Sequence, residues 1–205
     1  MPISHIALTN TTNLSVDVTG VMLAGGRSRR MGLDKATLVI NGEPIFARTL
    51  RILQQVFLKV LIAGDRPDLV VPGVHCVADI FPGSTLGGIH AGLTESTTPW
   101  VFVAPCDLPY PNAQLIHYLL TCRKGYDIVV PRTESGLEPV FALYHKKCLS
   151  AMEQMLARGD YRIYDFYDQF RVCYVDMESF PANWQRALCN INTPEDLRRL
   201  GKETL

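Results

Sequence analysis

The segment 18-VTGVMLAGGRSRRMGLDK-35 carries the strongest indication of the fold, because an apolar run leads directly into a glycine pair and a group of cations. A nearly continuous apolar run is typical of a strand buried on both faces of a parallel sheet. Gly25 and Gly26 would then lie at the carboxyl end of that strand, where open α/β folds bind their ligands. Bare glycine main chain lets successive N–H groups approach a phosphate closely. Four cations follow the first glycine: Arg27, Arg29, Arg30 and Lys35.

These features predict a binding site for a nucleoside triphosphate, whose negative charges the cations would neutralise. The sequence contains neither the G-x-x-x-x-G-K-[ST] pattern of P-loops nor the G-x-G-x-x-G pattern of dinucleotide-binding folds. The nucleotide would therefore be held in another way. A glycine turn followed by solvated surface arginines remains the structural alternative for this segment.

The chain beyond this segment alternates short apolar runs with amphipathic segments, which predicts strands alternating with helices. Strands are expected at 59–64, 100–107 and 126–132, and helices at 43–57, 86–96 and 112–125. Such alternation is typical of a parallel sheet with right-handed crossovers. The predicted fold class is therefore α/β, with three layers and a mostly parallel sheet flanked by helices.

The second half is expected to be less regular, with strands at 139–145 and 170–177 and a helix at 145–159. A capping pattern predicts a further helix that opens at Thr193. In the first predicted helix, Arg48 is expected to lie off the apolar face.

Length and composition favour one domain at 16–205, preceded by a flexible tail at 1–15. Hydrophobic residues make up 47% of the 205, which is enough for a sizeable core. Lys+Arg and Asp+Glu number 20 each, so no general attraction to nucleic acid or to an anionic membrane is expected. No apolar run is long enough to span a bilayer, and the N-terminus lacks the basic start of a secretory signal.

Six cysteines are spread widely along the chain, with no C-x-x-C pair among them. Their spacing does not fit a zinc site, and a disulfide framework is unexpected in a chain of this length. They are interpreted as mostly buried thiols, and the chain is expected to be cytoplasmic, where thiols stay reduced.

The segment 23-LAGGRSRRMGLDK-35 fits L-A-G-G-x-S-x-R-M-G-x-D-K and resembles the signature of the molybdenum cofactor guanylyltransferases, part of a wider nucleotidyltransferase superfamily. The resemblance extends over about residues 18–200. It implies a Rossmann-like nucleotidyltransferase fold and transfer of GMP from GTP to the molybdopterin cofactor, with Mg²⁺ as the metal. The resemblance also implies that the N-terminal part of the domain binds GTP and magnesium and that its C-terminal part binds the pterin.

Relatives that transfer cytidylyl or sugar-linked nucleotidyl groups more often carry L-A-A-G, so the pair Gly25-Gly26 favours guanine. A cytidylyltransferase for the same pterin, a sugar-phosphate nucleotidyltransferase and a non-catalytic nucleotide-binding module remain the alternatives. The resemblance also implies partners among the molybdoenzymes or other cofactor-biosynthesis proteins, and neither nucleic acid nor membrane.

Asp107 ends the apolar strand predicted at 100–107, where a carboxylate has little structural reason to stand. Mg²⁺ takes oxygen ligands and often shares its shell between one or two carboxylates and substrate phosphates. In the family the matching aspartate holds the metal, and a turn-forming role is the alternative. The catalytic residues implied by the resemblance are Arg30, Lys35 and Asp107.

Asp79 precedes the glycine-rich run 82-PGSTLGG-88 and matches a family aspartate that takes part in guanine-nucleotide binding. A glycine-rich turn at the start of a helix is the alternative for this run. The nucleotide-binding residues implied by the resemblance are Leu23, Ala24, Gly25, Gly26, Lys35, Asp79 and Asp107.

Near the C-terminus, 188-LCNINTPEDL-197 matches the family segment N-x-N-T-P-E-D/E-L. Asn190 and Asn192 flank one residue, so both amides would project to the same side of an extended chain and offer donors and acceptors to a ring. Asn192 could instead only shape the turn before the helix. The resemblance implies contacts to the pterin cofactor from Gly83, Gly88, Arg162, Asn190 and Asn192.

One position departs from the family pattern. Some members carry an asparagine that contacts the nucleotide just after the second strand, where this chain has Ala63 and Gly64. That contact would pass to backbone groups or to Asp65, or be lost. Among the five histidines none has metal-site or triad spacing, and His90 is expected to be a packed or partly exposed residue rather than a catalyst.

Overall fold

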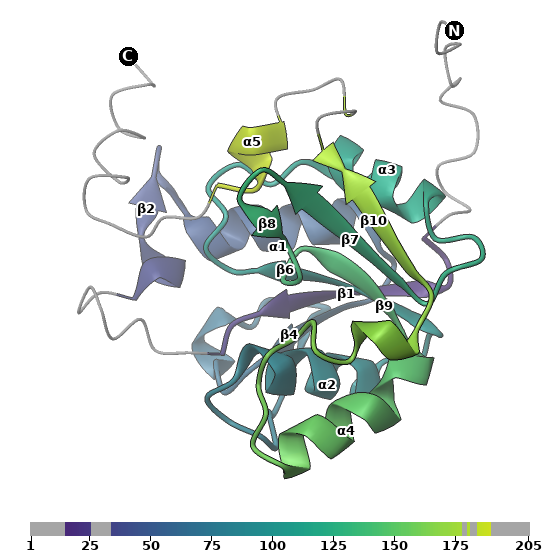
Figure 1. Cartoon of the computed structure of the whole chain (residues 1–205). Coiled ribbons are helices and arrows are strands. Elements are labelled where there is room, and N and C mark those ends of the chain that lie inside the picture. The colour runs from purple at the N-terminus through teal and green to yellow at the C-terminus, as the bar shows by residue number, and fades with distance from the viewer. Residues whose placement is uncertain (1–14, 26–33, 178–179, 181–183, 190–205) are drawn as a thin grey trace, which may run out of the picture.

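The computed structural model of the chain describes residues 15–25, 34–177, 180 and 184–189. Across these residues a central sheet lies between helices on both of its faces (Figure 1), so the predicted three-layer α/β class is confirmed. The order of strands in the sheet is β10-β7-β9-β6-β1-β4-β5, and β8 pairs with β7. The strands are β1 (Val18–Leu23), β4 (Val60–Ala63), β5 (His75–Val77), β6 (Trp100–Pro105), β7 (Ile128–Thr133), β8 (Gly136–Leu137), β9 (Ala142–His145) and β10 (Val172–Asp176).

The sheet is mostly parallel, as predicted. β1 runs parallel to β4 and β6, with Met22 opposite both Ile62 and Ala104. β5 is parallel to β4, and β10 is parallel to β7. β9 runs antiparallel to its two neighbours β6 and β7, so its first residue, Ala142, lies opposite Val103 near the end of β6.

Pairs of helices cover the two faces of the sheet. They are α1 (Ile45–Val56), α2 (Thr85–Glu95), α3 (Ala113–Thr121) and α4 (Leu149–Ala157). Successive side chains of a strand point to opposite faces. Met22 therefore packs in the core beneath α1 and α3, while Val21 packs in the core beneath α2 and α4. A short helix α5 (Trp184–Ala187) follows β10 in the described part of the chain.

The shortest elements were not predicted. They are β5, β8 and a hairpin of β2 (Val39–Ile40) with β3 (Glu43–Pro44). Strands of two or three residues contain too few alternations to give a periodic signal. The helix expected at 145–159 begins as the 3₁₀ turn η4 (Lys146–Cys148) and continues as α4. The helix predicted at Thr193 lies outside the described residues, as does the tail at 1–14.

Arg48, which was predicted to lie off the apolar face of its helix, is buried all the same. Arg48 is only 9% exposed, and its guanidinium donates to the carbonyl oxygens of Pro109, at 3.2 Å, and Ile40. Its Nε lies 3.4 Å from Glu43 Oε2. The apolar pattern of the helix could not reveal this, because the partners come from the β2–β3 hairpin and from the loop after β6. Arg48 thus ties the hairpin to the chain that follows Asp107.

The cysteines are less buried than expected. Cys148 is buried, Cys189 is exposed, and the four that are partly buried are Cys76, Cys106, Cys122 and Cys173. All six are free thiols. Burial raises the pKa of Cys148 to about 12, which makes it a poor nucleophile at neutral pH.

None of the helices in the described part of the chain has the length and apolar character needed to cross a membrane.

Asp127 anchors the start of β7 to two neighbouring segments. Its carboxylate accepts hydrogen bonds from Arg171 Nε at 3.0 Å and from Lys147 Nζ at 3.2 Å. These contacts, the Arg171 hydrogen bond first, lower the pKa of Asp127 to about 2. An unfolded aspartate has a pKa of about 3.9. The carboxylate therefore stabilises the fold above that value, and the stabilisation is lost as the pH falls toward the folded-state pKa.

We expect Asp127→Asn to lower the free energy of unfolding by about 1–2 kcal/mol near neutral pH, a value reduced for the exposure of the two cations. The difference from wild type should shrink as the pH falls from about 5 to about 2. Denaturant unfolding across this range measures it, with Asp168→Asn as the control because Asp168 is exposed. If the difference in the free energy of unfolding does not change with pH, the charge of Asp127 is not what stabilises the contacts at the start of β7.

Candidate functional site

A cavity of about 240 Å³ opens at the carboxyl ends of β1 and β6. This is the edge of a parallel sheet where α/β folds bind ligands. Its lining residues are Leu23, Ala24, Gly25, Asp34, Lys35, Ala36, Arg66, Thr85, Pro105, Cys106, Asp107 and Val140. Five residues predicted from the sequence are thus brought together: Leu23, Ala24, Gly25, Lys35 and Asp107.

The main chain that follows β1 forms one wall of the cavity. Ala24 N donates to Ala63 O at 2.9 Å, and Cys106 N donates to Leu23 O at 3.1 Å. Sheet hydrogen bonding therefore continues past the strand ends and fixes this main chain against β4 and β6. Gly25 is exposed, and no atom of the described residues lies within 4 Å of the place where its Cβ would be. The main chain at Gly25 is open to a ligand.

Gly64 packs directly against this glycine segment, at the position where some family members are expected to carry an asparagine. A Cβ on Gly64 would lie 2.7 Å from Gly25 N and 2.9 Å from Ala24 C, and the φ of Gly64 is +134°. Ala63 is fully buried, and Asp65 is not among the residues that line the cavity. In this arrangement the end of β4 offers close main-chain packing instead of an amide side chain.

We expect Gly64→Ala to lower both stability and nucleotide binding, because the methyl group would push the main chain of Ala24 and Gly25 away. The free energy of unfolding should fall by about 2–4 kcal/mol, from an unfavourable φ together with steric overlap. Gly73→Ala is the matched control, because Gly73 has a φ of +80° and none of the described residues comes within 4 Å of its Cβ position. Denaturant unfolding of both variants gives the comparison, and equal losses would contradict the steric role of Gly64.

Lys35 and Asp107 face each other in the cavity. Lys35 Nζ lies 3.8 Å from Asp107 Oδ2, and their side chains are 16% and 21% exposed. Lys35 is the first residue of the 3₁₀ turn η2 (Lys35–Thr37), which Asp34 caps by accepting a hydrogen bond from Ala36 N at 3.1 Å. Burial raises the pKa of Asp107, and the charge of Lys35 offsets part of this rise. The pair offers one cation and one carboxylate at a single place in a partly enclosed site.

Asp107 fits the predicted magnesium role. Among the described residues, no group of three or more His, Cys, Asp or Glu side chains could hold a metal ion. Mg²⁺ in nucleotide sites commonly takes one or two carboxylates and completes its shell with water and phosphates, so a single carboxylate such as Asp107 is compatible with the prediction. Burial, which raises the pKa of Asp107, disfavours its charged form, and a cation bound beside it would offset that cost. The magnesium assignment stays a prediction.

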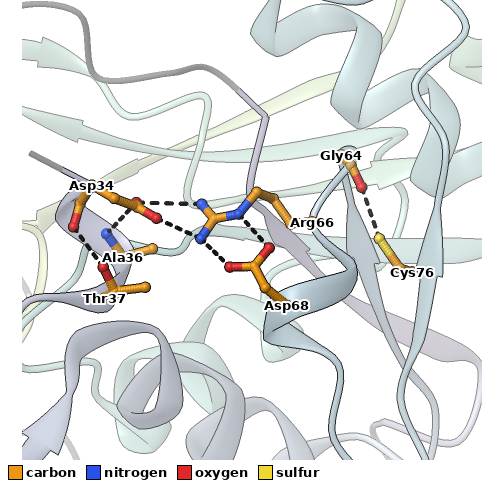
Figure 2. Close-up of polar contacts among 7 residues, drawn as sticks. All are labelled: Asp34, Ala36, Thr37, Gly64, Arg66, Asp68 and Cys76. Carbon is orange, nitrogen blue, oxygen red and sulfur yellow. Dashed lines mark hydrogen bonds and ion pairs between the residues drawn. The ribbon is translucent and has the colours of Figure 1, made fainter.

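Arg66 is a cavity residue that the sequence analysis did not identify. It follows β4, immediately before the 3₁₀ turn η3 (Pro67–Leu69), and its guanidinium lies between Asp34 and Asp68 (Figure 2). The shortest N–O distances to these carboxylates are 2.6 Å and 2.8 Å. The sequence feature that could have identified Arg66 is its place between two aspartates just after a predicted strand, in 65-DRPD-68.

Asp79 lies against the start of α2 and is not among the residues that line the cavity. Its Oδ1 accepts a hydrogen bond from Phe81 N at 2.8 Å, and a Cβ on Gly87 would lie 2.6 Å from that oxygen. Burial raises the pKa of Asp79, while the Phe81 N–H and nearby His90 oppose the rise. His90 is buried, with Nε2 at 3.3 Å from Glu153 Oε1. The role of Asp79 in nucleotide binding stays a prediction.

The described residues predicted to contact the pterin do not line the cavity. Gly83 is exposed in the turn before α2, with a φ of +96°. Gly88 faces β1, where its Cβ would lie 3.3 Å from Leu23 Cδ2. Arg162 is 73% exposed and lies 3.0 Å from Asp165. Predicted site residues that fall outside the described part of the chain are Gly26, Arg30, Asn190 and Asn192.

Comparison with known proteins supports the family resemblance found in the sequence. A family model described as the MobA-like NTP transferase domain matches residues 20–177. A probable molybdenum cofactor guanylyltransferase from Pelotomaculum thermopropionicum is 39% identical over 89% of this chain and 91% of its own length. A molybdenum cofactor guanylyltransferase from Vibrio atlanticus is 35% identical over 92% of this chain and 97% of its own.

A solved structure agrees with the fold. The crystal structure of molybdopterin-guanine dinucleotide biosynthesis protein A from Archaeoglobus fulgidus superposes with a TM-score of 0.78 at 21% identity. The match covers 91% of this chain and 98% of that one. The family model, the two relatives and the signature that contributes Ala24, Gly25 and Lys35 to the cavity lead to one conclusion. The chain belongs to the molybdenum cofactor guanylyltransferase family of MobA-like nucleotidyltransferases.

Proposed function

We propose that the chain transfers the guanylyl group of GTP to the terminal phosphate of molybdopterin, which gives the guanine dinucleotide and pyrophosphate. The observation that supports this most is the pairing of Lys35 with Asp107 in a cavity walled by the main chain of Ala24 and Gly25. A metal-bound triphosphate needs a cation, a carboxylate for the metal and bare main-chain N–H groups. The two named relatives are molybdenum cofactor guanylyltransferases, which supports guanylyl transfer to this acceptor.

In the proposed reaction, an oxygen of the pterin phosphate attacks the α-phosphorus of GTP in line with the leaving pyrophosphate. One P–O bond forms while the bond from the α-phosphorus to the bridging oxygen breaks, and the electron pair leaves with pyrophosphate. Both reactants are anionic, so the task of the protein is to neutralise charge and align the groups rather than to transfer protons.

Each residue has a distinct task in this proposal. Lys35 lies at the α-phosphate and stabilises the charge that builds in the transition state. The main chain at 24–26 and Arg30 hold the β- and γ-phosphates, and Asp79 fixes the nucleoside. Asp107 would hold Mg²⁺, which when bound neutralises phosphate charge and aligns the triphosphate.

The proposal extends to the cellular setting. The compartment is the cytoplasm, which the six free thiols support. The ligands are GTP and molybdopterin, and the receiving proteins are molybdoenzymes or other proteins of cofactor biosynthesis.

Release of pyrophosphate by the purified protein tests the proposed reaction. We expect GTP with molybdopterin to exceed CTP or UTP with molybdopterin by at least about tenfold. Omission of molybdopterin should abolish the release. A preference for CTP would identify a cytidylyltransferase, and UTP with a sugar phosphate would identify a sugar-phosphate enzyme. Binding of GTP with no release for any acceptor would identify a binding module.

A further inference from the structure

Two segments distant in the sequence meet at the rim of the cavity through Arg66, Asp34 and Asp68, which we call the clamp (Figure 2). Arg66 Nη2 donates to Asp34 Oδ2 at 2.6 Å, and Nη1 donates to Asp34 Oδ1 at 3.3 Å. The other side of the guanidinium donates to Asp68, from Nε at 2.9 Å and from Nη2 at 2.8 Å. Paired contacts to two carboxylates at once need the planar fork of arginine, which lysine lacks.

The Arg66 end of the clamp belongs to the rigid frame of the sheet. Arg66 N donates to Gly64 O at 3.0 Å, and Leu69 N donates to Arg66 O at 3.1 Å. Leu69 is buried in the core beneath α1, and Gly64 is pressed against the main chain of Gly25. The guanidinium therefore starts from a backbone that is fixed on both sides.

The Asp34 end of the clamp leads directly to Lys35. Asp34 accepts hydrogen bonds from Ala36 N at 3.1 Å and, through its carbonyl, from Thr37 Oγ1 at 3.1 Å. Lys35 thus lies between Asp34, which caps the turn, and the buried Ala36. Fixing Asp34 fixes the main chain from which the side chain of Lys35 reaches Asp107.

The clamp also balances charge at the site. Asp34 lines the cavity, and an uncompensated carboxylate there would repel a triphosphate. The hydrogen bond to Asp68 and the charge of Asp34 raise the pKa of Arg66, so the guanidinium stays charged. Its paired contacts already engage Nε and both terminal nitrogens, which favours a structural contact over a direct contact to the nucleotide.

We propose that Arg66 is a positioning residue that holds Lys35 in its working place through Asp34. This inference rests on the proposed function, because the working place of Lys35 is defined there. It assigns a role to Asp34, the residue immediately before the lysine in the signature segment.

A double-mutant cycle tests whether Arg66 acts through Lys35. We expect Arg66→Ala to lower kcat for pyrophosphate release about 10- to 50-fold, and to raise KM for GTP as well because Asp34 loses the cation beside it. In the Lys35→Ala background, Arg66→Ala should change kcat by less than about twofold, because the lysine it positions is gone. If Arg66→Ala still lowered kcat about 10- to 50-fold in the Lys35→Ala background, Arg66 would be acting on the substrate directly, and the proposal would be overturned.

Three variants separate the parts of the clamp. Asp68→Asn leaves the contact between Arg66 and Asp34 intact and should lower kcat by less than about threefold. Asp34→Asn keeps the acceptor for Ala36 N but weakens the ion pair, so it should reproduce much of the loss of Arg66→Ala. Arg66→Lys keeps the charge without the paired geometry and should restore only part of the activity. If Asp68→Asn lowered kcat as much as Arg66→Ala does, the proposed action of Arg66 through Asp34 would be contradicted.

A second measurement does not depend on the reaction. Acetylation by an N-hydroxysuccinimide ester, followed by mass spectrometry, compares the part-buried Lys35 with the exposed Lys124 of the same chain. We expect Arg66→Ala to raise the rate at Lys35 at least about fivefold and to leave Lys124 unchanged. A wild-type rate at Lys35 would refute the clamp whatever the substrate is. Faster labelling without any nucleotide turnover would leave the clamp standing and reject the proposed function.

Discussion

Lys35→Ala is expected to lower kcat for pyrophosphate release by about 100- to 1,000-fold, the usual loss when one preorganised charge is removed from a site. The side chain of Lys35 is 16% exposed and lies 3.8 Å from Asp107. Little water can screen the ammonium there, so its effect on a nearby phosphate is stronger than at the surface. Steady-state kinetics with GTP and molybdopterin measure the effect.

The matched control is Lys124→Ala, the same substitution at an exposed lysine in the turn after α3. It should leave kcat and KM unchanged. A loss confined to KM would mean that Lys35 binds GTP equally well in the ground and transition states. If kcat of Lys35→Ala stays within about threefold of wild type, the catalytic role of Lys35 is wrong.

Asp107→Asn is expected to reduce magnesium-dependent turnover by at least about 1,000-fold and to leave the protein at least as stable as wild type. The amide keeps the shape of the side chain and loses the charge that would hold the metal. Burial raises the pKa of Asp107 in the folded protein. Ionised Asp107 therefore destabilises the fold at a pH above its folded-state pKa, and this effect disappears below its unfolded-state pKa.

Two measurements separate the metal role of Asp107 from a structural one. Without nucleotide, the thermal midpoint of Asp107→Asn near neutral pH should equal or exceed that of wild type, and any gain should vanish near pH 3, below the aspartate pKa of about 3.9. A magnesium titration of turnover gives the functional effect, with exposed Asp168→Asn as control. A fall in the midpoint that parallels the fall in turnover would point to a structural role for Asp107.

Much of the nucleotide side of the fold and site could be predicted from the sequence, because its signals are local. The apolar run at 18–25 predicted β1, and the glycines that follow it predicted the exposed main chain at Gly25. A carboxylate at the end of an apolar strand singled out Asp107, which lies in the cavity with Lys35 as the signature implied.

What escaped prediction depends on contacts between distant parts of the chain. Arg66 and Asp34 are 32 residues apart, and Arg48 and Pro109 are 61 apart, so neither pairing leaves a periodic pattern. The predicted strands at 126–132 and 139–145 did carry an unused signal. A parallel pair needs a crossover of about a dozen residues or more. The short link between these strands therefore favoured the antiparallel β9 that the structure contains.

The reversed direction of β9 affects how such a site can vary. Because β9 begins at the edge where β1 and β6 end, the chain entering it at Val140 forms part of the rim of the cavity. The cavity residues that follow β1 and β6, such as Ala24 and Asp107, belong instead to segments that leave their strands. An insertion or deletion just before Ala142 would reshape one rim while every strand keeps its partners. A lineage with this topology can therefore reshape one side of the cavity through the length of one short loop, without changing the strands that position Ala24 and Asp107.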